Sequence, residues 1–379
     1  MSTNVKVARP GRNNFANFDK ILLSAVVALL FIGTLLVYAG TREWFRGNNL
    51  DPEYYLKRHV LNILIGALLA YGTTLIDYRL LRAYTPIVWG AGVLGLLVVL
   101  VAGTTVNSAK AWIAFPGGFQ LQPAELAKIA IIVGMAMVLA ERKDLRGDPT
   151  DSDVAKSLLV AAIPVGLILL QPDLGTVLII SASVVAMIGT SGAPTRWVAG
   201  LIIVAAVGGF VAVQAGVVSE YQVKRLQSFI DPAADPQLSG YQLRQARITI
   251  GSGGLLGKGL FNGPQTNGRF VPEQQTDFIF TVAGEELGFL GCSLILILYS
   301  IIFIRGFMIA RNTNDLFGRL VCVGVIAWFA FQTFENIGMT MGLMPMTGVP
   351  LPFLSYGGSS MFANLIGVGL LQNVHVRTR

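Results

Sequence analysis

The chain has 379 residues, of which 53% are hydrophobic and 13% are charged, and its formal net charge is +7. This composition excludes a soluble globular protein with an ordinary surface and indicates a polytopic membrane protein. Cys292 and Cys322 both fall within apolar runs, and His59 and His375 lie far apart in the sequence. We therefore predict neither a disulfide framework nor a metal site.

Apolar runs predict the transmembrane helices. A bilayer core of about 30 Å needs roughly 20 apolar residues in each helix, and runs of this kind begin near residues 20, 60, 84, 122, 157, 174, 197, 279, 316 and 354. The run from Phe278 to Ile304 is counted as one tilted helix. The first run, Ile21 to Tyr38, follows a basic tail without a small-residue cleavage site, so we expect a retained span. The predicted fold is all-α, with ten transmembrane helices.

The distribution of Lys and Arg predicts the orientation, because short cytoplasmic segments are enriched in these residues. If the N-terminus is inside, the inner segments hold sixteen Lys and Arg and the short outer loops hold five. Both termini are therefore predicted to be cytoplasmic. Residues 1–379 are predicted to form a single membrane domain, with a cytoplasmic tail at 1–18 and a large extracellular loop at 219–277 between helices seven and eight.

The large outer loop is predicted to be ordered and basic. It contains several aromatic residues, a helix-like stretch from Tyr241 to Ile250, and cations that include Arg225 and Lys258. The stretch GSGGLLGKG, residues 251–259, lacks the glycine spacing and the final Ser or Thr of a nucleotide-binding P-loop. A glycine-rich turn with Lys258 can still bind a pyrophosphate anion through backbone N–H groups, and a plain flexible turn is the alternative.

Charged residues occur at the outer ends of several predicted spans. Glu125 and Lys128 are three residues apart at the start of the fourth span, on one helix face. They form either a self-satisfied ion pair or a functional pair, because intramembrane charges often mark functional sites. Asp173, in the tight outer turn QPDLGT, is expected on the same side of the membrane. Glu335 and Asn336 are polar residues within the ninth span and serve either helix packing or function.

Two further stretches on the outer face carry polar groups. In RFVPEQQTDFIFTVAGEELG, residues 269–288, Asp277 lies where a polar loop changes abruptly into an apolar helix. Such an acid is either functional or only favoured by the helix dipole. The stretch PMTGVPLPFLSYGGSS, residues 345–360, joins the last two spans. Its hydroxyl groups, including that of Ser355, either bind the polar head of a ligand or belong to a rigid re-entrant corner.

Together these motifs resemble those of the SEDS family of bacterial cell-wall proteins. The resemblance covers nearly the whole chain, with the motifs in matching order. The VPEQ and TGVPLPF sequences resemble the elongation-type members of the family more than its division-type members. The motifs that carry the resemblance are QPAELAK (122–128), QPDLGT (171–176), GSGGLLGKG (251–259), FVPEQQTDFIF (270–280), GEELGFLG (284–291) and PLPFLSYGGSS (350–360).

The resemblance implies a multi-pass enzyme of the bacterial plasma (inner) membrane that polymerises lipid II into glycan strands outside the cell during elongation. It implies a class B penicillin-binding protein as partner, contact with membrane lipid and no nucleic acid. No cofactor is firmly implied, although a divalent cation is compatible with the reaction. Asp277 matches the family's essential acid, Glu125 and Lys128 its charged pair, and Asp173 its turn acid.

The chain departs from the family pattern at two positions. Gln275 stands where the family usually has His, and Ala111 stands before Trp112 where the family usually has Arg. Neither departure affects Asp277. Any role that depends on that His or Arg is therefore in doubt for this chain, and Lys110 is only a partial substitute for the Arg.

The implied reaction is an inverting attack by a sugar 4-hydroxyl on an anomeric carbon, with a lipid pyrophosphate as leaving group. We hypothesise that Asp277 is the general base. Lys128, with Lys258 or Arg225, is expected to stabilise the leaving pyrophosphate, and Glu125 to hold Lys128. Other expected substrate contacts are Asp173, Trp112 and Ser355. Two alternatives are a flippase for a lipid-linked precursor and a non-catalytic scaffold for a penicillin-binding protein.

Overall fold

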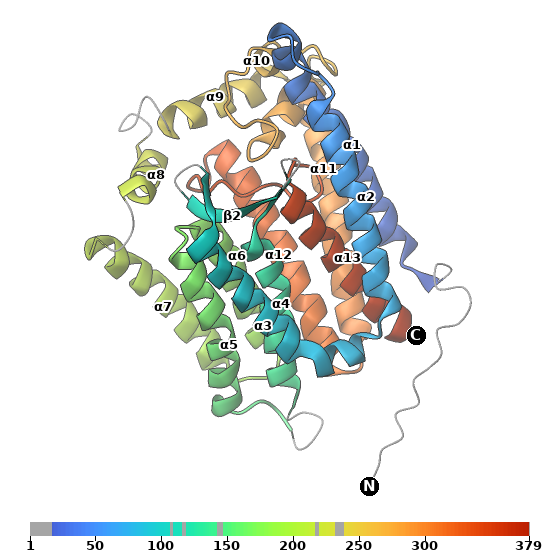
Figure 1. Ribbon diagram of the computed structural model, residues 1–379, viewed down its shortest axis with the longest axis vertical. Helices are drawn as coiled ribbons and strands as arrows, with labels where there is room; N and C mark the ends of the chain where they lie inside the picture. Colours follow the sequence, from blue (N-terminus) through green and yellow to red (C-terminus); the bar gives the residue numbers. More distant parts are fainter. Residues whose placement is uncertain are drawn as a thin grey trace.

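The computed structural model describes residues 17–106, 109–115, 119–141, 147–216, 220–231 and 239–378. Long helices run roughly side by side through the body of the molecule, and shorter elements gather at one end (Figure 1). The predicted cytoplasmic tail, apart from its last two residues, lies outside the described residues.

The helices are α1 (Lys20–Gly47), α2 (Tyr54–Leu75), α3 (Tyr78–Ala102), α4 (Pro123–Glu141), α5 (Asp151–Leu169), α6 (Leu174–Thr190), α7 (Thr195–Gln214), α8 (Glu220–Ile230), α9 (Ser239–Ser252), α10 (Pro264–Asn267), α11 (Ile279–Asn312), α12 (Leu316–Met341) and α13 (Gly358–Thr378).

Each of the ten predicted apolar runs forms a helix. Six of these helices, α1, α3, α4, α5, α11 and α12, are long and apolar enough to cross a membrane by length and composition, and α6 and α7 contain the shorter apolar stretches Leu174–Thr190 and Thr195–Val211. Aspartates fix several of the helix starts, because their side chains accept hydrogen bonds from backbone N–H groups of the first turn. Asp19, Asp77, Asp173 and Asp315 cap α1, α3, α6 and α12 in this way.

The helices α4 and α12 form the centre of the molecule. The most apolar segment of α4 is 78% buried and that of α12 is 67% buried, whereas the corresponding segment of α3 is only 17% buried. A helix that is apolar all round is expected to be buried on all sides. The central helices therefore carry their few polar side chains into the protein interior, where burial costs free energy unless the polar group is hydrogen-bonded.

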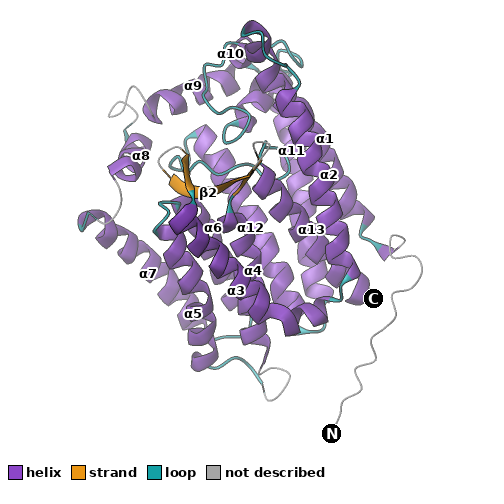
Figure 2. Cartoon of the chain, in the orientation of Figure 1, coloured by secondary structure: helices purple, strands orange, loops and turns teal. Residues whose placement is uncertain are grey.

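A small antiparallel sheet corrects the all-α prediction. Strands β1 (Thr104–Val106), β2 (Ala109–Phe115) and β3 (Phe119–Leu121) pair in the order β1-β2-β3, with Ile113 opposite Leu121. Figure 2 shows these strands beside the upper ends of α3 and α4. The sequence suggested only a loop here, because β1 and β3 have three residues each and β2, AKAWIAF, shows no alternation of apolar and polar residues. Pairing satisfies the backbone polar groups of a connection that lies over the helix ends.

The large predicted loop is partly helical and contains α8, α9 and α10. The predicted helix at Tyr241–Ile250 is confirmed as α9. The loop is fastened to α11, whose helical path is interrupted at Gly288, where φ is 64° and ψ is −165°. At this interruption the backbone N–H groups of Phe289 and Leu290 donate to carbonyls of Gly254 and Leu255.

Glu285 and Glu286 lie in the first turns of α11, before the interruption at Gly288, and bind the loop there. Glu285 accepts hydrogen bonds from the backbone N–H groups of Gln265 (2.9 Å) and Thr266 (2.7 Å) and from the Thr266 hydroxyl (2.6 Å). Glu286 accepts from the backbone N–H of Phe261 at 3.0 Å. These two buried acids therefore fasten the loop that contains α8, α9 and α10 to the bundle.

We expect Glu285→Ala to destabilise the protein by about 2–4 kcal/mol, because it leaves several buried donors unsatisfied. The measurement is thermal unfolding of the detergent-solubilised protein. Ser300→Ala, at an exposed position on the same helix, is the matched control and should leave the unfolding temperature unchanged. Equal unfolding temperatures for both variants would show that Glu285 does not hold the loop.

Candidate functional site

A cavity of about 870 Å³ lies where the small sheet, the loop between α7 and α11 and the ends of the long helices meet. The segments that enclose it are far apart in the sequence. The lining side chains that matter below come from α2, the sheet, the start of α6, α8 and the two segments beside α11 and α13: Tyr55, Arg58, Trp112, Phe119, Gln122, Asp173, Arg225, Glu273, Gln275, Thr276, Asp277, Thr347, Tyr356, Ser359 and Ser360.

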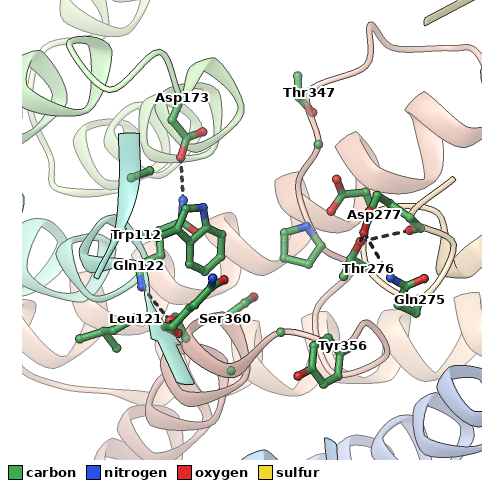
Figure 3. Close-up of a pocket in the computed structure, with 18 of the residues that line it drawn as sticks. Trp112, Leu121, Gln122, Asp173, Gln275, Thr276, Asp277, Thr347, Tyr356 and Ser360 are labelled. Atoms are coloured by element: carbon green, nitrogen blue, oxygen red, sulfur yellow. Dashed lines mark hydrogen bonds between the residues drawn. The ribbon is translucent and has the colours of Figure 1, made fainter. Parts of the chain in front are cut away.

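Asp277 lies in the cavity wall two residues before α11, outside that helix. Its backbone N–H donates to the Glu273 carbonyl (3.2 Å), and its own carbonyl accepts a hydrogen bond from Asn336 Nδ2 (2.7 Å). Its carboxylate is half-buried and lies next to Gly348, where a Cβ atom would stand 3.2 Å from Asp277 Oδ2. The backbone of Asp277 is thus fixed while its carboxylate faces the cavity (Figure 3).

The surroundings of Asp277 raise the pKa of its carboxyl group to about 7. The largest cause is desolvation in the cavity wall, and the negative charges of Glu273 and Asp173 add to it, whereas the positive charge of Arg225 lowers the pKa. A carboxylate with a pKa close to neutrality can accept a proton and release it again under physiological conditions, which suits a general base.

Asp173 lies on the opposite side of the cavity from Asp277 (Figure 3). As the N-cap of α6 it accepts hydrogen bonds from the backbone N–H (3.0 Å) and the hydroxyl (2.8 Å) of Thr176, and Gln122 Nε2 donates to its Oδ2 at 3.0 Å. Three donors therefore hold this carboxylate in place. Trp112 of β2 lies beside it, so these two predicted residues do line the cavity with Asp277.

Two arginines supply positive charge among the described lining residues. Arg225 of α8 approaches the Met346 carbonyl with Nη1 at 3.5 Å, and this nitrogen is 3.6 Å from the position of a Cβ atom on Gly348. Arg225 is therefore close to the Asp277 carboxylate. Arg58 of α2 stacks on Tyr54, with its guanidinium carbon 4.6 Å from the ring centroid. In the sequence, Arg58 stands out only as a loop charge.

Glu125 and Lys128 lie beneath the cavity and do not line it. Both are almost completely buried, at 3% and 2% exposure. Lys128 Nζ is 2.9 Å from Glu125 Oε2 and 3.1 Å from Gln332 Oε1, and it lies 4.5 Å from the ring centroid of Trp328. The ion pair predicted from the sequence is present, but protein groups surround the ammonium group.

Lys258 and Ser355 are also absent from the cavity wall. Lys258 is exposed, and the backbone N–H groups of Lys258 and Gly259 donate to carbonyls of Glu285 and Glu286, so they are not available to an anion. Ser355 is buried, and its Oγ accepts a hydrogen bond from the Leu351 N–H at 2.8 Å. The neighbouring Tyr356, Ser359 and Ser360 line the cavity instead.

Within the part of the chain that the structure describes, no three His, Cys, Asp or Glu side chains are grouped so that they could hold a metal ion. One wall presents Asp277 and Arg225, the opposite wall presents Asp173 and Trp112, and Arg58 also lines the cavity. The cavity thus offers guanidinium groups to an anionic part of a ligand and carboxylates to its hydroxyl groups.

The chain matches known proteins over almost its entire length. Residues 20–379 match the family model of FtsW, RodA and SpoVE, which is described as "Cell cycle protein". The chain is 37% identical to the probable peptidoglycan glycosyltransferase FtsW of Trichlorobacter lovleyi, covering 95% of this chain and 93% of that protein.

Two solved structures are also similar. One, described as "Structural coordination of polymerization and crosslinking by a peptidoglycan synthase complex", has a TM-score of 0.79 and 32% identity, covering 95% of this chain and 98% of that one. The crystal structure of the rod shape determining protein RodA of Thermus thermophilus has a TM-score of 0.70 and 31% identity, covering 96% of this chain and 98% of that one.

Proposed function

The chain belongs to the FtsW, RodA and SpoVE family and is a multi-pass peptidoglycan glycosyltransferase, and we propose that it polymerises lipid II, with Asp277 as general base. The observation that carries this proposal is the carboxylate of Asp277, which lies in a cavity of about 870 Å³ beside Arg225 with its pKa raised to about 7. A base of this kind and a nearby cation are what the reaction requires.

The proposed reaction forms one bond and breaks one bond. The 4-hydroxyl oxygen of the acceptor sugar attacks the anomeric carbon of the donor, while the bond from that carbon to the lipid pyrophosphate breaks and the configuration inverts. Asp277 takes the hydroxyl proton. The pyrophosphate leaves with the electron pair of the broken bond, and the proton on Asp277 passes to solvent before the next addition.

We propose that Arg225 and Arg58 bind the leaving pyrophosphate. Both line the cavity, and a guanidinium group can donate two parallel hydrogen bonds to a phosphate. The two arginines take the place of Lys128 and Lys258, which the sequence favoured, because neither lysine lines the cavity. Asp173 and Trp112 are proposed to contact the sugars from the opposite wall.

We propose that ten helices, α1 to α7 and α11 to α13, cross the bacterial plasma membrane, with both termini cytoplasmic and residues 219–277 outside. The excess of Lys and Arg in the inner segments supports this orientation. The start of α1 and the end of α13 lie away from α9 and α10 (Figure 1). The whole chain would then be one membrane domain whose cavity opens at the outer face.

We further propose an elongation role and a class B penicillin-binding protein as partner. The elongation role is supported by the VPEQ sequence before Asp277 and by TGVPLPF at residues 347–353. The partner is supported by the similarity to a chain from a peptidoglycan synthase complex. The position of Asp277 at a helix end, with its cavity beside the outer loop, favours the enzyme over a flippase, whose site is expected near the bilayer midplane.

Asp277→Asn is expected to lower the polymerisation rate by about 100-fold to 10,000-fold, because an amide cannot accept the hydroxyl proton. The measurement is glycan strand formation by the purified protein with lipid II, in the presence of its partner. Glu53→Gln, which neutralises an exposed acid at the start of α2, is the control and should retain full activity. Retained synthesis by a folded Asp277→Asn protein would rule out Asp277 as the base.

The pH dependence of the rate should report the ionisation of Asp277. The carboxylate is the active form, so the rate is expected to rise as pH increases through about 7. Glu273→Gln removes a negative charge that raises this pKa, and the rise should therefore move to lower pH. A rise at the same pH in both proteins would contradict the proposed electrostatic environment.

Arg225→Gln and Arg58→Gln test the pyrophosphate assignment. Each is expected to lower kcat/KM for lipid II by about tenfold to 100-fold, since a charge-assisted hydrogen bond contributes about 1.5–3 kcal/mol. Lys258→Gln is the matched control, because Lys258 is an exposed cation of the same loop and should be neutral. A larger loss in Lys258→Gln than in either arginine variant would reverse the assignment.

A further inference from the structure

The buried Glu125–Lys128 pair has no place in the cavity, and its function must lie elsewhere. Burying two charges is costly even when they are paired, and the ammonium group of this pair contacts other protein groups besides Glu125. The contacts of Lys128 lead to α12 through the side chain of Gln332, which is completely buried at 0% exposure. This side chain connects the ion pair to the wall of the cavity.

The orientation of the Gln332 amide follows from the chemistry of its neighbours. Its Oε1 accepts hydrogen bonds from Lys128 Nζ (3.1 Å) and from Trp328 Nε1 (2.6 Å). An ammonium group and an indole N–H can only donate, so the amide oxygen must face them. The amide nitrogen must then face the other way, where it donates to the Pro350 carbonyl at 2.7 Å.

Asn336, one helical turn further along α12, extends the same connection. Its Nδ2 donates to the Val349 carbonyl and to the Asp277 carbonyl, both at 2.7 Å. Two consecutive carbonyls of the segment 345–352 are therefore held by amides of α12, and one of these amides also holds the backbone of Asp277. Gly348, the residue before them, lies directly against the Asp277 carboxylate.

The segment 345–352 depends on these side chains because its own backbone supplies little support. It contains Pro345, Pro350 and Pro352, which have no N–H group, and it forms neither helix nor strand apart from a turn at its end. Another side-chain contact, from the hydroxyl of Tyr299, reaches the Pro352 carbonyl. Side-chain donors from α11 and α12 thus take the place of regular secondary structure.

We propose that Gln332 is a positioning residue, and that the Glu125–Lys128 pair acts through it to hold the segment 345–352 against Asp277. In this arrangement Lys128 does not contact the substrate. Lys128 fixes the amide of Gln332, and this amide fixes the carbonyl of Pro350. The segment 345–352 then sets the distance between Gly348 and the Asp277 carboxylate. The role in catalysis rests on the proposed function, whereas the mechanical link does not.

Hydrogen–deuterium exchange without substrate tests the mechanical link. Gln332→Glu keeps an acceptor for Lys128 and Trp328 but removes the donor to Pro350. Glu125→Gln with Lys128→Met removes both charges together and leaves no unpaired buried charge. Both proteins are expected to exchange the amides of residues 346–355 about tenfold faster than the unmodified chain.

Thr333→Val is the matched control, because Thr333 is a buried neighbour on α12 whose hydroxyl has no hydrogen-bond partner among the described residues. It should leave the exchange of this segment unchanged. If the charge-pair variant exchanges the segment at the control rate, while Gln332→Glu exchanges it faster, the proposed link from Lys128 is wrong. This result is obtained whether or not the chain polymerises lipid II.

A double-mutant cycle on the polymerisation rate tests the catalytic part. Gln332→Glu is expected to lower the rate by about 100-fold, the effect of a displacement of about 1 Å at a reacting group. When Glu125→Gln and Lys128→Met are added to Gln332→Glu, the rate should fall by less than about threefold further. If the loss in rate caused by Gln332→Glu and the loss caused by the charge-pair changes multiply in the combined variant, Lys128 acts on the substrate directly.

The pH profile separates positioning from a general loss of folded protein. When the segment loosens, water reaches Asp277 and desolvation raises its pKa less, so the rise in rate should move to lower pH in the Glu125→Gln with Lys128→Met variant, which leaves the net charge unchanged. A smaller rate with an unshifted pH profile would indicate only a loss of active protein and would overturn the positioning role. An inactive unmodified chain would instead refute the proposed function.

Discussion

The hydrogen bonds from the amides of Gln332 and Asn336 to backbone carbonyls are the interactions on which the site depends. They hold a proline-rich segment that cannot form regular structure, and they join it to the backbone of Asp277. A buried carbonyl without a donor costs free energy, so α12 must carry polar side chains through an otherwise apolar interior. This requirement explains why the central helix α12 carries buried amides.

The same principle explains the acids of α11. Glu285 and Glu286 are almost completely buried, and their oxygens accept hydrogen bonds from the backbone of the loop between α7 and α11. They fasten α9 and α10 beside the interruption at Gly288, and this places the end of the loop, with Glu273 and Asp277, at the rim of the bundle. Buried carboxylates thus position the loop, whereas the half-buried carboxylate of Asp277 remains open to the cavity.

The sequence predicted the helices well, because each long apolar run has only one stable backbone conformation away from water. It also located Asp277 at the junction between a polar loop and an apolar helix. It did not predict the three-stranded sheet, because β1 and β3 have three residues each and β2 shows no alternation of apolar and polar residues. It also did not predict the contribution of Arg58, which resembles any loop cation. Lys128 was expected in the cavity because charge near a membrane surface suggests function. The direction in which its side chain points depends on how α4 packs against α12.

A structure of the chain with a lipid II analogue that cannot react tests the central claim most directly. We predict that the acceptor 4-hydroxyl lies about 2.6–3.2 Å from the Asp277 carboxylate, with the pyrophosphate against Arg225 or Arg58. We also predict that Lys128 keeps its contacts with Glu125 and Gln332. A pyrophosphate bound to Lys128 or Lys258, or an acceptor hydroxyl out of reach of Asp277, would contradict both the proposed mechanism and the positioning role of Gln332.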